Sequence, residues 1–138
     1  MTDIEAGVGI CQLRKLDNFV RRRKDIFDYY KNMLKDIDNV ITHHYDKSII
    51  SPSFYRFVLK VPNEIRFNLL DSMFKKGIAC TIGVPKPLHR LLCLDNNNYI
   101  GSENLYNEVL SLHIYPSLKN NDIKYVMNEL IASIKDLK

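Results

Sequence analysis

Hydrophobic residues near the end of the chain recur with the period of a helix. They follow the spacing i, i+3, i+4, i+7, i+8, i+11 and i+14, at Ile123, Val126, Met127, Leu130, Ile131, Ile134 and Leu137. This spacing predicts an amphipathic helix with one apolar stripe. Asn120 or Asn121 can cap it by accepting hydrogen bonds from its first amides. A short apolar run, Leu110 to Tyr115, predicts a strand just before it, so the helix is expected to cover a sheet.

Alternating side chains predict another strand, from Phe54 to Val61, in the middle of the chain. Pro62 ends this strand, and Asn63 is expected to cap a helix from Glu64 to Lys76. One set of alternate positions in the strand is uniformly apolar or aromatic. This set is expected to face the core, and it consists of Tyr55, Phe57, Leu59 and Val61.

Glycine and proline divide the following segment into short elements. Gly77 stands where a glycine commonly closes a helix, and a strand is expected directly after it, from Ile78 to Ile82. A polar loop, Asp95 to Gly101, is expected to precede a short helix, Ser102 to Val109, with Ser102 as its cap. Between the expected strand and this polar loop, GVPKPLHR is expected to form a rigid loop. Its two prolines hold the side chains of Lys86 and His89 in place.

The beginning of the chain reads as helix almost throughout, from Met1 to about Asp36. Thr2 or Asp3 can cap its first turn. Further along, Asp17 and Asn18 mark a kink or a new helix start. The pattern therefore predicts either two consecutive helices or one bent helix.

Two glycines interrupt the first helical segment. Gly7 and Gly9 each cost roughly 1 kcal/mol relative to alanine in a helix interior. Another backbone is therefore expected to approach this turn closely, or the helix is irregular there. Apolar residues add to the smooth surface, and the segment is predicted to be an interface element. They are Ile4, Val8, Cys11 and Leu13.

The order of these elements predicts an α+β fold: a small three-stranded antiparallel sheet with helices on one face. No internal repeat and no linker to a second domain is evident. We expect a single domain over residues 1–138, with leading helices in residues 1–36 and an α/β small domain in residues 53–138.

Composition places the chain among ordinary globular proteins, with 138 residues, 46% hydrophobic and 26% charged residues, and a net charge of +4. No apolar run reaches the roughly 18 residues of a membrane span, and the first residues do not resemble a signal peptide. The three cysteines form no C-x-x-C pair, so a cytoplasmic, reducing location is expected. We expect buried, unpaired thiols at Cys11, Cys80 and Cys93.

Two clusters invite a chemical interpretation. Arg21 to Lys24 point in four directions on a helix, so they are read as a solvated face, with a phosphate or nucleic-acid contact as the alternative. His43, His44 and Asp46 lie in an expected loop without a partner pair at helical spacing, so no metal site is predicted. The chain also has no glycine-rich phosphate loop, serine nucleophile motif or usefully spaced carboxylate pair. No catalytic residue is predicted.

Three blocks of sequence together resemble one family. MTDIEAGVGICQLRKLDNFVRRRKDIFDYYKNML is similar to a stretch of the DegT/DnrJ/EryC1/StrS aminotransferases. GIACTIGVPKPLH resembles the strand and Pro-Leu-His turn of that family, and LSLHIYPSLKNNDIKYVMNEL resembles its closing strand and helix. Signature positions of the first block are matched by Thr2, Asp3, Ala6, Gly9, Gln12, Leu13, Leu16, Arg23 and Tyr30.

The resemblance implies a part of a larger enzyme. Members use pyridoxal phosphate to aminate keto-sugars attached to nucleotides, and this chain resembles the small C-terminal domain of such a fold-type I aminotransferase. In the family, the cofactor lysine, an aspartate and the phosphate contacts belong to a large domain that precedes the position of Met1. A truncated gene, a misplaced start or a frameshift is therefore expected. We predict no cofactor in this chain alone and pyridoxal phosphate in the complete enzyme.

The chain departs from the family pattern near the expected substrate side. Pro85 and Lys86 replace the usual aromatic residue before Pro-Leu-His, while His113 replaces a typical proline and Lys119 a capping hydroxyl. His89 has two readings: a polar group lining the sugar-nucleotide side of the cleft, or a loop histidine hydrogen-bonded to backbone. With Lys86, it is the substrate-proximal candidate.

The sequence therefore predicts the C-terminal domain of a nucleotide-sugar aminotransferase in the synthesis of cell-surface polysaccharide or glycan precursors. It is not expected to be catalytic alone. The expected partners are the missing large domain, the second subunit of a dimer and a nucleotide sugar, with no nucleic acid and no membrane. The alternative is a stand-alone, non-catalytic binding or regulatory module on the same scaffold.

Overall fold

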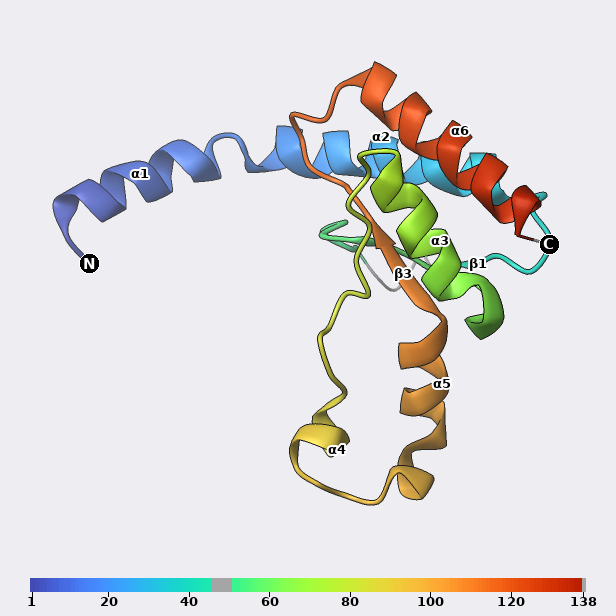
Figure 1. The fold of residues 1–138 in the computed structure, drawn as a ribbon. Coiled ribbons are helices and arrows are strands. Elements are labelled where there is room, and N and C mark those ends of the chain that lie inside the picture. The colour runs from blue at the N-terminus through green and yellow to red at the C-terminus, as the bar shows by residue number, and fades with distance from the viewer. Residues whose placement is uncertain (46–50, 138) are drawn as a thin grey trace.

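The computed structural model describes residues 1–45 and 51–137 (Figure 1). One antiparallel sheet has the order β1-β2-β3, with β1 at Ile41–Thr42, β2 at Phe57–Lys60 and β3 at Val109–Leu112. A short 3-10 helix, η1, spans Asn96–Tyr99. The α-helices are α1 (Asp3–Leu13), α2 (Leu16–Leu34), α3 (Asn63–Lys75), α4 (Leu88–Leu91), α5 (Ile100–Glu108) and α6 (Asn120–Asp136).

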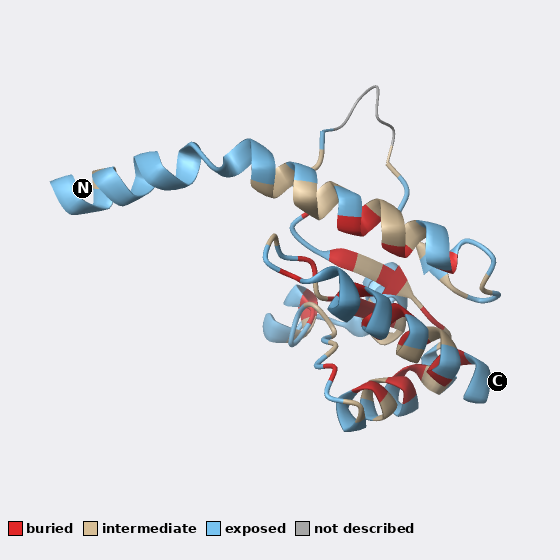
Figure 2. Cartoon of the chain, turned by 90° about the horizontal axis from the view of Figure 1, so that it is seen from above, coloured by how far each residue is buried: buried red, intermediate tan, exposed pale blue. Residues whose placement is uncertain are grey.

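The register of the sheet decides which face is buried. Phe57 pairs with Leu112 and Leu59 with Leu110, so these four apolar side chains share one face. They join a core with the buried stripes of α2, α3 and α6 (Figure 2). The predicted α+β fold, a three-stranded antiparallel sheet with helices on one face, is confirmed.

Aromatic contacts fix α2 on this face. The ring centroids of Phe27 and Tyr30 each lie 5.1 Å from that of Phe57, both in edge-on geometry. The hydroxyl of Tyr30 donates to the carbonyl oxygen of His113 at 3.1 Å, so its polar end is satisfied although the side chain is buried. The helix is thereby tied to both β2 and the segment after β3.

One predicted strand was wrong. The segment from Ile78 to Ile82 makes a single bridge to the sheet, between Thr81 and Ser111. Its first residue is part of the end of α3 instead of a strand, because the amide of Ile78 donates to the carbonyl of Met73. Its end turns away at Gly83, which has a φ of +87°. The third strand is β1, which directly precedes the expected loop of His43 and His44.

Helix ends follow the predictions in part. The reciprocal bonds between Thr2 and Glu5 cap α1, and Gly77 closes α3 with a φ of +75°. The predicted asparagine cap of α6 was wrong, because Oδ1 of Asn120 accepts from Nη2 of Arg22 at 2.7 Å instead. Asn63 and Ser102 are not caps either: they lie inside α3 and α5, which begin without a side-chain cap. The expected loops contain α4 and η1.

Helix α1 projects from the body of the molecule (Figure 1). None of its residues is buried, and nothing lies within 4 Å of a Cβ built at Gly7 or Gly9. The prediction of three buried thiols was therefore wrong. Cys11 lies on this exposed helix and Cys93 is exposed in the turn after α4, while Cys80 is half-buried.

Candidate functional site

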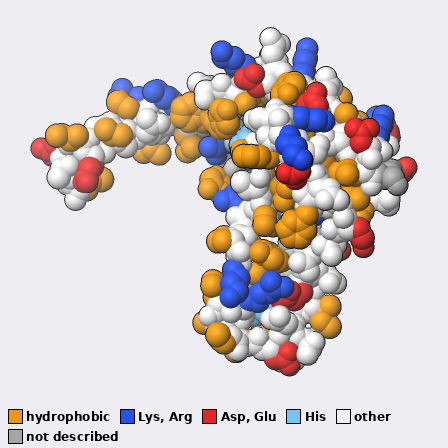
Figure 3. Space-filling view, in the orientation of Figure 1, with side chains coloured by type: hydrophobic (Ala, Val, Ile, Leu, Met, Phe, Trp, Pro, Cys, Tyr) orange, Lys and Arg blue, Asp and Glu red, His pale blue; other side chains and the backbone are white. Residues whose placement is uncertain are grey.

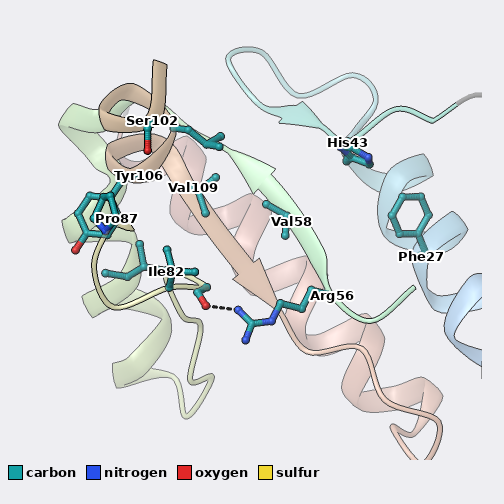
Figure 4. Close-up of a pocket in the computed structure, with 12 residues that line it drawn as sticks. Phe27, His43, Arg56, Val58, Ile82, Pro87, Ser102, Tyr106 and Val109 are labelled. Carbon is teal, nitrogen blue, oxygen red and sulfur yellow. Dashed lines mark hydrogen bonds between the residues drawn. The ribbon is translucent and has the colours of Figure 1, made fainter. Parts of the chain in front are cut away.

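The sheet face that carries Val58 and Val109 forms the floor of a cavity of about 500 Å³ (Figure 4). Val58 of β2 and Val109 of β3 point into it because they alternate with the core-facing positions. Ile82 and Tyr106 line one side, and Arg56 lies directly before the start of β2. The cavity is mostly apolar with a few polar groups at its edges, which is typical of a small-molecule site.

Two hydrogen bonds hold the loop that forms one wall. Nη1 of Arg56 donates to the carbonyl oxygen of Gly83, as Figure 4 shows. The hydroxyl of Tyr106 donates to the carbonyl oxygen of Pro85 at 3.0 Å. Gly83 suits this turn in two ways, because its φ is positive and a Cβ would lie 3.2 Å from Nη1 of Arg56. The loop is therefore fixed from both the sheet and α5.

The two substrate-proximal candidates have different surroundings. The side chain of Lys86 is exposed beside the cavity wall. His89 is buried in α4 and is not a lining residue; its Nε2 lies 2.5 Å from Oε1 of Glu103. Its ring stacks on Tyr99 with centroids 4.7 Å apart. His89 thus bonds to a carboxylate, whereas the alternative reading had expected a backbone partner, and its role toward substrate stays a prediction.

The site contains residues that the sequence did not single out. Glu103 also pairs with Arg90, with Oε1 accepting from Nε at 2.7 Å and Oε2 from Nη2. The hydrogen bond from Arg90, followed by that from His89, lowers the pKa of Glu103 to about 2. Glu103 is therefore ionised at neutral pH. No local spacing links it to His89, and its position in the first turn of α5 was the only available signal.

A second guanidinium lies under the same helix. Arg66 of α3 is only 1% exposed, and its Cζ lies 4.5 Å from the ring centroid of Phe67 and 5.9 Å from that of Tyr106. Its Nε and Nη1 have no hydrogen-bond partner among the described residues. Arg90 lies over the ring of Tyr106 as well, at 5.2 Å. Cationic groups therefore surround this part of α5.

The described residues offer little to a metal ion. His43 and His44 are exposed, and no group of three or more His, Cys, Asp and Glu side chains is placed to hold a metal in residues 1–45 and 51–137. Asp46, the third residue of the sequence cluster, lies outside the described residues. Within the same ranges, no helix combines the length and the apolar character needed to cross a lipid bilayer.

Comparison with known proteins agrees with this fold. Residues 1–131 match the sequence model of the DegT/DnrJ/EryC1/StrS aminotransferase family. The chain belongs to this family. It is 28% identical over 134 residues to dTDP-4-dehydro-2,3,6-trideoxy-D-glucose 4-aminotransferase of Saccharopolyspora spinosa, covering 96% of this chain and 34% of that protein.

Solved structures extend the likeness to three dimensions. The aminotransferase TlmJ of Streptoalloteichus hindustanus superposes with a TM-score of 0.91 at 25% identity, covering 99% of this chain and 37% of that one. The PLP-form of the putative sugar aminotransferase Spr1654 of Streptococcus pneumoniae superposes with a TM-score of 0.88 at 21% identity, covering 100% of this chain and 37% of that one. The chain thus spans about a third of the length of the relatives it matches.

Pyridoxal phosphate, which the family resemblance implies, does not fit this chain by itself. The cofactor needs a lysine amine and a partner for its pyridinium nitrogen. The cavity on the open sheet face is lined by neither a lysine nor a carboxylate. None of the lysines within the described residues is buried. The prediction that the chain alone holds no cofactor stays a prediction.

Proposed function

We propose that this chain is the C-terminal domain of a pyridoxal-phosphate-dependent nucleotide-sugar aminotransferase and has no transaminase activity alone. Residues 1–138 act as one domain, with leading helices in residues 1–36 and the α/β small domain in residues 53–138. The chain completes the enzyme by packing on a cofactor-binding large domain and a second subunit, in the cytoplasm. The product serves polysaccharide or glycan synthesis. Family membership and the sugar-nucleotide name of the S. spinosa relative support this substrate class.

The observation that carries the proposal is the exposure of α1. Apart from Asp3, Glu5 and Gln12, the residues of this helix are small or apolar and are spread around it, yet Ile4 and Leu13 are 81% and 68% exposed. A helix that is apolar on all sides is normally buried on all sides. Figure 3 shows hydrophobic side chains along this projection. The missing large domain and second subunit would supply surfaces on more than one side of it.

A second apolar surface supports the same assembly. We call residues 83–108, with the loop, α4, η1 and α5, the arm. Hydrophobic and basic side chains gather on it in Figure 3. Several exposed apolar residues lie on the arm, and a contiguous exposed apolar surface is typical of an interaction site. They are Val84, Leu88, Leu91, Leu92, Leu94, Ile100 and Leu105.

Within the cleft, we assign the direct substrate contact to Lys86 and place His89 behind it. The Lys86 ammonium is exposed on a fixed loop, and an ammonium suits the phosphates of a sugar nucleotide. In the completed enzyme, Lys86→Gln should raise KM for the sugar nucleotide more than it lowers kcat. His89→Ala should alter kinetics more than thermal stability. Normal kinetics with a collapsed Tm would assign His89 a purely structural role.

The decisive experiment begins with the DNA upstream of Met1. An open frame that encodes a cofactor-binding domain would be expressed with this chain, in one polypeptide or two, and assayed for amine transfer to a nucleotide keto-sugar. Activity should require both parts and pyridoxal phosphate. The chain alone should retain no cofactor absorbance after desalting, and a persistent band abolished by one lysine substitution would contradict the proposal.

One observation favours the alternative of a stand-alone binding module. The chain forms the cavity on the open sheet face without another domain, and its lining is mostly apolar. A promoter and ribosome-binding site directly ahead of Met1, without an upstream cofactor domain, would support this alternative. A strictly monomeric chain with full amide protection from Asp3 to Leu13 would support it as well.

A further inference from the structure

Helix α4 is held to α5 by a single carboxylate. Oε1 of Glu103 lies 2.5 Å from Nε2 of His89 and accepts a hydrogen bond from Nε of Arg90 at 2.7 Å. Among the described residues, neither His89 nor Arg90 pairs with another carboxylate. The two partners are consecutive in α4, so one acceptor fixes the orientation of the whole four-residue helix.

The charge of Glu103 determines where His89 carries its proton. Arg90 keeps this carboxyl ionised at neutral pH, and an ionised carboxylate can only accept hydrogen bonds. Nε2 of His89 must therefore be the donor. Tyr99 restrains the ring plane further, because the two rings are inclined by only 13°. The imidazole is thus fixed in both orientation and tautomer.

The same face of α5 also holds the loop before α4. Tyr106 follows Glu103 by three residues, which places the two side chains on one side of the helix. Its hydroxyl binds Pro85, while the amides of Arg90 and Leu91 bind the carbonyl of Pro87 at 3.1 and 3.2 Å. Lys86 lies between these two anchored prolines, so its position follows from one contact with α5 and from the placement of α4.

We propose that Glu103 is a positioning residue: it keeps the proton of His89 on Nε2 and ties α4 to α5, so that the loop presents Lys86 in one orientation. Tyr106 is the second anchor of this loop. The role of Lys86 toward substrate rests on the proposed function. The proton position and the anchoring concern this chain alone and are tested on it.

The test compares Glu103→Gln with Glu108→Gln in the full chain. Glu108 is the matched control because it is also on α5 and pairs with Lys60 at 2.6 Å, away from α4. Nitrogen-15 NMR of the histidine rings at alkaline pH reads the tautomer. The wild-type chain and the control should keep the proton of His89 on Nε2, whereas Glu103→Gln should populate the Nδ1–H form, because an amide can donate or accept.

Hydrogen exchange provides the second readout. The amides of Leu91, Leu92 and Leu94, which bond within the α4 turn, should exchange about tenfold faster in Glu103→Gln than in the control. Equal exchange and an unchanged tautomer in both variants would overturn the proposal. A wild-type His89 with its proton on Nδ1 would overturn it as well, even if Glu103→Gln does not fold.

Tyr106→Phe isolates the anchoring of the loop. It removes one hydroxyl and keeps the ring between Arg66 and Arg90. The amide resonance of Lys86 should shift and its exchange accelerate, while His89 keeps its proton on Nε2. An unchanged Lys86 resonance would overturn the loop assignment. None of these readouts requires cofactor or activity, so a failed reconstitution would refute the proposed function and leave them intact.

Discussion

Helices α1 and α6 lie at opposite ends of one chain and differ in what they bury. The apolar stripe of α6 is buried in the core, apart from Ile131, which is half-buried and packs against it, as does Leu137 directly after the helix. The apolar residues of α1 are spread around the helix, and none is buried. The comparison teaches that apolar content alone does not bury a helix. A helix is buried when its apolar residues form a stripe that matches an available surface.

The largest effect is expected from matched leucine truncations in these two helices. Leu130→Ala in α6 removes a side chain that is 0% exposed, and should lower the free energy of unfolding by about 2–5 kcal/mol. Leu13→Ala in α1 should change it by less than about 0.5 kcal/mol. Urea denaturation of the isolated chain measures both. Similar losses for both variants would show that α1 packs on the domain in solution.

A smaller effect is expected where α6 meets α2. Nη2 of Arg22 donates to the carbonyl of Leu118 and to Oδ1 of Asn120, each at 2.7 Å. Arg22→Met should therefore lower the free energy of unfolding by about 1.5–3 kcal/mol, the range for hydrogen bonds to a charged group. Arg21→Met is the control, since Arg21 is an exposed neighbour on the same helix. If both variants unfold at the same urea concentration, the two hydrogen bonds of Arg22 contribute nothing to stability.

Acid should distinguish the arm from the helical core. The pKa of Glu103 is about 2 in the folded chain against an ordinary value of 4.5. Its ion pairs therefore stabilise the fold above about pH 4.5, and this contribution is lost as the pH falls toward 2. Between those values, the urea midpoint of Glu103→Gln should fall less steeply than that of the wild type. If the urea midpoints of the two chains fall in parallel with pH, the assigned pairing of Glu103 with Arg90 and His89 is wrong.

The smallest effect on stability is expected from removing α1 altogether. A chain of residues 14–138 should unfold at the same urea concentration as the full chain, because α1 buries nothing. The full chain should self-associate through its apolar projection or exchange its amides rapidly from Met1 to Leu13, and the shortened chain should stay monomeric. Light scattering and hydrogen exchange measure this. A full chain that stays monomeric and fully protected would contradict it.

The sequence predicted the elements whose signals are local. The stripe of α6, the alternation around Phe57 and the closing Gly77 each depend on neighbours within one or two turns. The fold class and the family followed from such elements in their order.

The strand assignments failed where pairing depended on distant partners. Ile78 to Ile82 has a strand-like composition, but its first amide closes α3. The two residues of β1 show no alternation long enough to be recognised, and they pair only because β2 offers its edge. Both errors are cases in which tertiary contacts overrode local preference.

The candidate site was predicted less well than the fold. The sequence selected Lys86 and His89 because two prolines fix their loop, and the loop is indeed anchored. It missed Glu103, Tyr106 and Arg66, because each acts through a partner at least thirteen residues away. Such pairs leave no periodic signal in a single sequence.

Arg22 is hydrogen-bonded to Leu118 and to Asn120, which lie 96 and 98 residues further along the chain. The central strand β2 likewise pairs with β3, which follows only after α3, α4 and α5, and the register of this pair completes the core. Contacts this distant slow folding and leave little that can form early. During synthesis, the apolar face of α2 must therefore remain without its final partner until α6 has left the ribosome. Chaperone binding to the nascent chain would be concentrated on that stretch, and stopping synthesis before α6 would leave no folded domain.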